Sequence, residues 1–576
     1  MLLPARRSEV AHSASSGARP IARVTDSSAF GLCSEDSELR VGARQQLRCA
    51  PRWSCLPVAC VLGVCALGLS AGVALAAGES AKAQLHAEKG LRAAESGDLE
   101  SAEAELRQAV GLSPVDPFYL GSLGVILGRR QKLDESNVFF QRALQNNPDE
   151  SSLRYNLASN QFQLGQSRLA RENLERVLKA RPGDKATALL LGMVLEDLKV
   201  YSEAARLLSS VPELVSGRPA SVIALTRAYY HTNQREQARQ SLRSLLDLPA
   251  PIEAVFLGAK TAAEAGDFET AERLFQYIGK TYPDKGKLGY NLALVQFQAK
   301  RIPDSQATLL ELVRTGHQSS EVFNLLAWCY HRQNYFEEAV AAMDQAIALD
   351  ASRESNYFDL CTILIAHQRF LVAYEAVKKA VEVAPNSFHG YRLKSWIEAK
   401  LNYRGAAVAT WSRAVELNPS SPEAILGLGR AQWIDGRSKE AAATFEKAIG
   451  LFPRDARLHQ EYGRMLLSNG ESGDSSTESR AILLLKTAIA LDGLLADSYY
   501  ELGNLALNKD NPREALGYIE TAAKLEPDSS KVHYALARAY RRLGRNDEYA
   551  REIRAFQTLK AQEDKIERDY ALHSEI

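Results

Sequence analysis

Residues that could carry out chemistry are sparse in this sequence, and their spacing assembles no reaction centre. None of the ten histidines stands three or four residues from another, so no helix offers a pair of imidazole metal ligands. A P-loop and a His-Glu-x-x-His motif are both missing. The string 68–72 (GLSAG) spells a nucleophile elbow, but it lies inside an apolar run rather than in a strand–turn–helix context. We therefore expect a protein that is not an enzyme and that uses no catalytic residue, cofactor or metal ion.

Cysteine is concentrated near the N-terminus. Five of the seven Cys precede residue 66, which leaves Cys329 and Cys361 for the rest of the chain. Two thiols are too few for a disulfide framework or a thiolate zinc site. We expect both to be small buried core residues, with a bridge between them as the alternative.

The charge balance argues against nucleic acid as a partner. Lys and Arg total 70, Asp and Glu total 70, and the formal net charge is zero, whereas a nucleic-acid binder usually carries a basic excess. The chain is 46% hydrophobic and 24% charged, which is typical of a folded protein. Only 17 Phe and 5 Trp are present while Ala, Leu and Arg abound, and this favours helices over sheets.

An uncharged apolar segment separates the first fifty residues from the rest of the chain. Residues 53–78 contain no charged side chain, and Arg44, Arg48 and Arg52 precede them. The apolar run 56–77 ends in a small-residue cleavage pattern. We expect 53–78 to be a signal peptide or a membrane anchor helix, because arginines before such a run place the following residues across the membrane. The predicted location is periplasmic or extracytoplasmic, with an inner-membrane anchor if the segment is kept.

Residues 1–52 fit a signal peptide poorly, because so many residues precede the apolar run. Residues 1–40 are rich in Ser, Arg and Ala, contain five carboxylates and show no periodicity. We expect either a disordered N-terminal extension or a start codon assigned too early. A start at Val41 would give a well-proportioned signal peptide.

From residue 83 the sequence repeats itself with a period of 34 residues. Segments 117–150 and 422–455 both show an early Leu-Gly pair and a small residue twelve positions later, followed by an aromatic residue, an Ala and a Pro. Fourteen such units cover 83–563. The small residue is an Ala in most units: Ala102, Ala170, Ala204, Ala238, Ala271, Ala339, Ala373, Ala407, Ala441, Ala481 and Ala515.

This pattern resembles the tetratricopeptide repeat (TPR) family, in a bacterial-type exported or membrane-anchored form. The resemblance implies an all-α fold, an α-solenoid that winds as a right-handed superhelix of about fourteen helix–turn–helix units. Small residues let the paired helices approach closely, as at Gly90 and Ala102 or Gly503 and Ala515. A glycine with positive φ is expected to end the first helix of five units, at Gly97, Gly165, Gly266, Gly436 and Gly544.

Three stretches depart from the regular unit. Between residues 210 and 320 the closing Pro loses its regular position in the repeat. Ser305 also stands where most units have the recurring small Ala, which we call the pivot Ala. These departures predict a local bend or looser packing. The insertion Glu471–Ser479 in the twelfth unit is expected to be a solvent loop. Residues 564–576 are expected to form a polar C-terminal cap, which solenoids need.

The resemblance also implies a concave groove lined by the first helix of each unit. Carrying over the second, fifth, ninth and twelfth positions of that helix gives aromatic candidates that could grip an extended peptide or stack on sugar rings. They are Tyr155, Phe162, Tyr230, Phe256, Tyr290, Phe297, Trp328, Phe358, Trp396, Trp433, Tyr500 and Tyr534. The alternative is that several of them fill the space between adjacent hairpins.

Basic residues follow in the C-terminal part of the same face: Arg392, Arg430, Arg457, Arg464, Arg538 and Arg541. They could hold an acidic peptide, a terminal carboxylate or an anionic polysaccharide, and the alternative is that they are solvated. We expect a non-catalytic scaffold outside the cytoplasm that binds other proteins, either extended peptide segments or folded subunits of an envelope complex. The competing hypothesis is a component of an envelope polysaccharide or secretion assembly whose groove contacts glycan. The membrane would be a partner only through an uncleaved 53–78.

Overall fold

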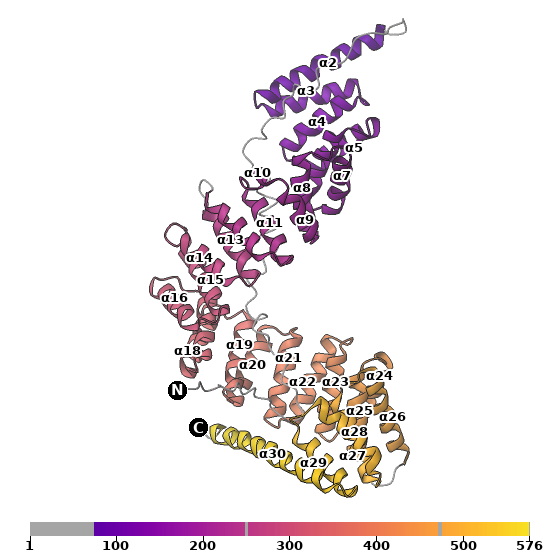
Figure 1. Cartoon of the computed structure of the whole chain (residues 1–576). Coiled ribbons are helices and arrows are strands. Elements are labelled where there is room, and N and C mark those ends of the chain that lie inside the picture. The colour runs from indigo at the N-terminus through magenta and orange to yellow at the C-terminus, as the bar shows by residue number, and fades with distance from the viewer. Residues whose placement is uncertain (1–73, 248–251, 470–474, 575–576) are drawn as a thin grey trace, which may run out of the picture. The chain divides into compact units, whose positions relative to one another are not determined.

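The computed structural model describes residues 74–247, 252–469 and 475–574 (Figure 1). Every regular element in these ranges is a helix. The described residues form two compact units that meet in sequence at His317 and Gln318. We call them the N-terminal unit (74–317) and the C-terminal unit (318–574) and describe each by itself.

The N-terminal unit contains seven consecutive antiparallel helix pairs. The pairs are α2 (Ala74–Glu95) and α3 (Leu99–Leu112), α4 (Pro117–Arg129) and α5 (Leu133–Asn146), α6 (Ser151–Gln163) and α7 (Ser167–Ala180), α8 (Lys185–Asp197) and α9 (Tyr201–Ser209), α11 (Pro219–His231) and α12 (Arg235–Arg243), α13 (Ile252–Glu264) and α14 (Phe268–Tyr277), α15 (Lys285–Gln298) and α16 (Ile302–Arg314). Two short elements, α10 (Pro212–Val215) and the 3₁₀ helix η2 (Ser244–Asp247), follow α9 and α12.

The C-terminal unit contains seven further pairs of the same kind. The pairs are α17 (Ser320–Arg332) and α18 (Phe336–Leu349), α19 (Glu354–Ala366) and α20 (Phe370–Val383), α21 (Phe388–Lys400) and α22 (Arg404–Leu417), α23 (Pro422–Ile434) and α24 (Ser438–Leu451), α25 (Ala456–Asn469) and α26 (Ser475–Leu491), α27 (Ala496–Asn508) and α28 (Pro512–Leu525), α29 (Ser530–Arg542) and α30 (Asn546–Ser574). The fourteen described pairs confirm the predicted all-α solenoid.

A residue in the left-handed region ends the first helix of each pair whose turn is described. The five predicted glycines have positive φ, between +71° at Gly266 and +87° at Gly97. In eight other pairs a residue with a side chain takes this conformation: Gln131, Lys199, Asn233, Lys300, Asn334, Gln368, Asn402 and Asp510. Sequence reasoning missed these eight, because the helix packing on both sides of the turn imposes the conformation even where no glycine relieves it.

Close packing at the pivot explains why small residues recur there. Ten of the eleven pivot alanines have no exposed surface, and Ala407 is 5% exposed. A Cβ added to Gly503 would lie 2.4 Å from Ile519 Cγ1. Ser305, which replaces Ala in α16, is also fully buried, and its hydroxyl donates to the Ala293 carbonyl at 2.7 Å. The serine therefore satisfies its polar group inside the helix pair and leaves the packing close.

Irregular units shorten their second helix. In the fourth pair α9 ends at Ser209, and α10 begins at Pro212, whose ring cannot continue the helix. In the fifth pair α12 ends at Arg243 and is followed directly by the 3₁₀ helix η2, which ends at Asp247, the last described residue before 252. The expected departure between 210 and 320 is therefore a change in the second helix at its C-terminal end.

The described part of the insertion in the twelfth unit is helical. Residues 470–474 lie outside the described range, but α26 begins at Ser475, so the expectation of a loop up to Ser479 was wrong for 475–479. The string Ser-Ser-Thr-Glu at 475–478 places Glu478 in the first turn, where a carboxylate interacts favourably with the positive end of the helix.

Predictions about the N-terminus lie mostly outside the described residues. Residues 1–52 and the apolar stretch up to residue 73 are not described, and α2 contains the remainder of 53–78. Among the helices of the described ranges, none combines the length and the apolarity that a membrane crossing requires. Cys329 and Cys361 are both buried, as expected, and no disulfide joins them.

Candidate functional site

Successive first helices of the C-terminal unit place a strip of charged side chains across four repeats. Helix α23 contacts α25, α25 contacts α27, and α27 contacts α29. The charged strip consists of three cations and three carboxylates at nearly one-repeat spacing: Arg430, Glu461, Arg464, Asp497, Glu501 and Lys531.

Arg464 on α25 lies at the centre of the charged strip. Its guanidinium is 3.2 Å from Glu461, 3.5 Å from Asp497 and 3.5 Å from Glu501. On α29, Lys531 Nζ donates to Asp497 Oδ1 at 2.6 Å. Arg430 on α23 closes the strip at the other end, 3.5 Å from Glu461. The strip is electrically balanced, with three positive and three negative groups.

Burial and the ion-pair partners shift the pKa values of Arg464, Asp497 and Glu501. Burial opposes the charge on Arg464, but Glu461, Asp497 and Glu501 together hold its pKa above the usual value. Burial also opposes ionisation of Asp497, and Arg464 and Lys531 overcome it, so the pKa of Asp497 is lowered. For Glu501 burial prevails over the attraction of Arg464, and its pKa is raised. Glu501 is therefore protonated more easily than Asp497.

One aromatic candidate contacts the charged strip, and a second lies three residues after Lys531 on α29, on the same side of that helix. The ammonium of Lys531 lies 5.0 Å from the centre of the Tyr500 ring, within cation–π range. Tyr534 is 46% exposed, and its ring packs against Phe556 of α30 at 5.1 Å. Both phenols thus combine an apolar ring with a polar tip beside ion-paired side chains, which is a composition suited to protein recognition.

The predicted arginines mostly pair within the chain. Arg392 is 3.3 Å from Glu423 of α23, and Arg430 and Arg464 belong to the charged strip. Arg538 donates to the side-chain oxygens of Asn504, at 3.0 Å, and Asn508, at 3.4 Å. The acidic partners on neighbouring repeats were missed at the sequence level. Their separations of 31 residues (Arg392–Glu423 and Arg430–Glu461) and 33 residues (Arg464–Asp497) are close to the repeat and could have revealed them.

The aromatic candidates divide by burial. Phe162, Phe256, Phe297 and Trp328 are buried, so they belong to the core and not to an accessible face. Tyr155, Tyr230, Tyr290, Phe358, Trp396, Trp433 and Tyr500 are partly exposed, and Tyr534 is exposed. The fifth and ninth helical positions therefore do not have the same exposure in every unit, because the neighbouring hairpin covers some of them.

In the N-terminal unit, Tyr230 belongs to a polar cluster that spans two repeats. Its hydroxyl donates to Asp267 Oδ2 at 3.0 Å, and Arg239 Nε donates to the same oxygen at 2.7 Å. Burial disfavours ionised Asp267, but the Arg239 and Tyr230 hydrogen bonds lower its pKa, and burial raises the pKa of Tyr230. The Tyr230 hydroxyl therefore forms a hydrogen bond between α11 of the fifth pair and the residue that precedes α14 of the sixth pair.

A second polar cluster joins α17 and α19. Asn324 Nδ2 lies 2.8 Å from Asp359 Oδ2 and 3.1 Å from the side-chain oxygen of Asn356. Burial raises the pKa of Asp359 to about 6, against the hydrogen bonds from Asn324 and Trp328. This carboxylate was not among the sequence candidates, since one acidic residue on a helix carries no motif.

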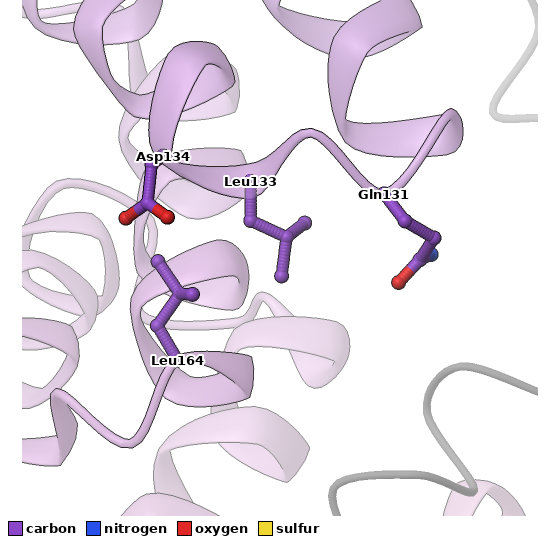
Figure 2. A pocket seen from close by; sticks show the side chains of 4 residues that line it. All are labelled: Gln131, Leu133, Asp134 and Leu164. Atoms are coloured by element: carbon purple, nitrogen blue, oxygen red, sulfur yellow. The ribbon is translucent and has the colours of Figure 1, made fainter.

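One small hollow lies at the turns of two neighbouring pairs in the N-terminal unit. Figure 2 shows its lining: Gln131 in the turn before α5, Leu133 and Asp134 at the start of α5, and Leu164 directly after α6. Its volume is about 300 Å³, at the lower limit for a small-molecule site. The lining offers a single titratable group, and among the described side chains no three of His, Cys, Asp or Glu could share a metal ion.

Sequence profiles described as tetratricopeptide repeat match residues 87–151, 155–219, 262–329, 320–353, 396–456 and 500–562, which together exceed half of the chain. The chain is 20% identical over 375 residues to cellulose synthase operon protein C of Pseudomonas fluorescens, covering 63% of this chain and 27% of that protein. It is 24% identical over 230 residues to anaphase-promoting complex subunit 3 of Schizosaccharomyces pombe, covering 39% and 33%.

This chain thus spans about a third or less of the length of these curated relatives. Among solved structures, the Cut9–Hcn1 hetero-tetramer of the anaphase-promoting complex aligns over 87% of this chain and 97% of that one, with 13% identity and a TM-score of 0.33. The fourteen helix pairs, the pivot alanines and the distributed profile matches lead to one assignment: the chain belongs to the tetratricopeptide repeat family.

Proposed function

We propose that this protein is a non-catalytic scaffold that binds extended segments of other proteins on the first-helix face of its C-terminal unit. The observation that carries the proposal is the charged strip, which continues without a break across α23, α25, α27 and α29 with Tyr500 and Tyr534 beside it. A surface with regularly spaced polar groups of both signs and aromatic rings suits the backbone and mixed side chains of a bound segment.

The preferred segment carries both charge signs. Each carboxylate and each cation of the strip already has a partner in the chain, so a purely acidic ligand would have to displace Glu461, Asp497 or Glu501 from Arg464. A segment that carries both acidic and basic side chains can bind without losing these ion pairs outright. It provides a new partner of opposite charge for each group whose internal ion pair it weakens.

Site-specific photocrosslinking in cells tests this proposal. A photoreactive phenylalanine replaces Tyr534, and in a matched variant it replaces Leu483, which is exposed on α26. We expect a reproducible set of crosslinked partner peptides from position 534 and not from position 483. Equal crosslinking from both positions, or none from 534 while the tagged chain still captures partners, would overturn the assignment to this face.

We also propose an extracytoplasmic location, supported by the arginines before the apolar segment 53–78. N-terminal sequencing of the protein isolated from cell fractions is the test. A mature N-terminus near residue 78, or an intact segment in the membrane fraction, is the expected result. A soluble cytoplasmic chain that retains 53–78 would contradict it.

The second candidate function is a role in an envelope polysaccharide assembly, favoured by the similarity to cellulose synthase operon protein C. There the partly exposed Trp396 and Trp433 would stack on sugar rings. Retention on immobilised cellulose or another envelope glycan that is lost in Trp396→Ala and Trp433→Ala, with protein capture unchanged, would favour this candidate over the protein-binding one.

A further inference from the structure

The turns that join the helices of the ninth and tenth pairs expose apolar side chains. Leu371 and Val372 at the start of α20 are 63% and 54% exposed, and Tyr403 before α22 is 42% exposed. Aromatic ring contacts connect the ninth and tenth pairs at these turns. The ring centres of Phe370 and Trp396 are 6.0 Å apart, and those of Tyr374 and Tyr403 are 5.5 Å apart. We define the turn edge as Leu371, Val372, Lys400, Tyr403 and Arg404.

The cations of the turn edge have no carboxylate partner among the described residues. Lys400 Nζ lies 5.4 Å from the centre of the Trp396 ring. Arg404 donates to the Asn402 side chain at 2.8 Å and to the Ile434 carbonyl at 3.4 Å. Both side chains are exposed. This sets the turn edge apart from the charged strip, where every guanidinium or ammonium group is balanced by a carboxylate.

The helices that begin at this edge strengthen its positive potential. The first turns of α20 and α22 contain no acidic residue, whereas α18 begins with Glu337 and Glu338 and α24 with Glu440. The exposed N–H groups of a helix N-terminus carry partial positive charge, which an acidic first turn normally offsets. A Cβ added to Gly405 would meet no atom within 4 Å, so the first turn of α22 is open to a partner.

From this combination we infer that the turn edge is a second interaction surface, which docks a protein segment carrying both apolar and acidic side chains. Leu371, Val372 and Tyr403 would contact the apolar side chains, and Lys400 and Arg404 would pair with the carboxylates. The charge complementarity selects an acidic segment, because the cations and the two helix N-termini all favour negative groups. The turn edge shares no residue with the charged strip, so this inference stands apart from the function proposed above.

A peptide-display selection on the full-length chain, followed by affinity measurement, tests the inference. We expect the selected peptides to combine Asp or Glu with aliphatic or aromatic residues. The double variant Lys400→Glu/Arg404→Glu should bind a selected peptide at least about tenfold more weakly. The same peptide with its acidic residues changed to Lys should bind the double variant and not the wild type. This charge swap separates recognition from misfolding, because an unfolded variant cannot gain a ligand.

Matched controls complete the test. Leu371→Ser/Val372→Ser should weaken binding too, while Lys447→Glu and Leu451→Ser, both exposed on α24, should leave it unchanged. Selected peptides without acidic residues would overturn the inference, and so would peptides that bind the double variant as tightly as the wild type. An anionic polysaccharide that binds the turn edge while no peptide is selected would also overturn it and assign the surface to glycan.

Discussion

Lys531 Nζ lies 2.6 Å from Asp497 Oδ1, and the two residues are 34 positions apart, one repeat of the array. The same carboxylate lies 3.5 Å from Arg464 on the preceding first helix. Asp497 therefore links three consecutive repeats. In a solenoid each repeat contacts only its neighbours, so such a link adds directly to the interface between them.

Asp497→Asn should weaken the interfaces on both sides of α27. The amide keeps the shape but loses the charge, which leaves the part-buried Arg464 with two carboxylates and Lys531 with none. We expect a loss of about 1–3 kcal/mol in the free energy of unfolding, less than for a fully buried pair because the side chains are partly exposed. Urea denaturation of the full-length chain measures it.

The matched control for Asp497→Asn is Glu416→Gln. Glu416 pairs with Arg413 at 2.8 Å, and both side chains are exposed on α22. Because exposed pairs contribute little, we expect a change below about 0.5 kcal/mol. Equal losses for the two variants would show that Asp497 does not couple the repeats.

Asp359 should make stability depend on pH in the opposite direction from an ordinary ion-paired carboxylate. Its pKa is raised from 3.8 to about 6 by burial. Above pH 6 the folded chain holds a charged group that the unfolded chain solvates better, so stability is lowered. As the pH falls from 6 towards 4, the folded state takes up a proton first and this loss disappears.

Asp359→Asn removes the buried charge and can still accept the hydrogen bond from Asn324. We expect the variant to be more stable than the wild type by about 1–3 kcal/mol at pH 7.5, and nearly equal to it at pH 4. Thermal unfolding at both pH values gives the comparison. The control Asp350→Asn affects an exposed carboxylate whose pKa is lowered by Ser352, so it should give no gain at pH 7.5. A gain from Asp359→Asn that does not change with pH would contradict the titration.

The fold could be predicted well from the sequence, because each of the many repeats independently indicates the same helix pair. Pivot alanines, turn glycines and closing prolines recur at one period, and an error in one unit does not disturb the others. The sequence indicated the binding face less well. Whether Phe256 or Trp433 is exposed depends on how the next hairpin covers it, and that is a tertiary property. The partners of Arg464 were also missed, because a residue considered alone does not show that its counterion lies one repeat away.

Gly503→Ala tests the packing at the pivot. The added methyl group would lie 2.4 Å from Ile519 Cγ1 and 3.3 Å from the Ala515 carbonyl oxygen, so α27 and α28 would have to separate. We expect a loss of about 1–3 kcal/mol in unfolding free energy. Gly517→Ala on α28 is the control, since its Cβ meets nothing within 4 Å and it should stabilise the helix by about 0.5–1 kcal/mol. Opposite signs for two Gly→Ala changes in one hairpin would identify close approach, rather than helix propensity, as the constraint at Gly503.

The left-handed turn residues allow a reciprocal exchange. Lys199 has φ +62° although it carries a side chain, and Gly436 has φ +82° at the corresponding turn of another unit. Lys199→Gly should relieve the left-handed conformation and stabilise the N-terminal unit by about 0.5–1 kcal/mol, while Gly436→Ala should destabilise the C-terminal unit by about 1 kcal/mol. Hydrogen exchange of the flanking helices locates each effect, because the unit that changes stability should change its protection while the other does not. If Lys199→Gly instead lowers the hydrogen-exchange protection of α8 and α9, the lost side-chain packing and the added freedom of the unfolded chain outweigh the relief of strain. The contacts of the Lys199 side chain would then be its main contribution at this turn.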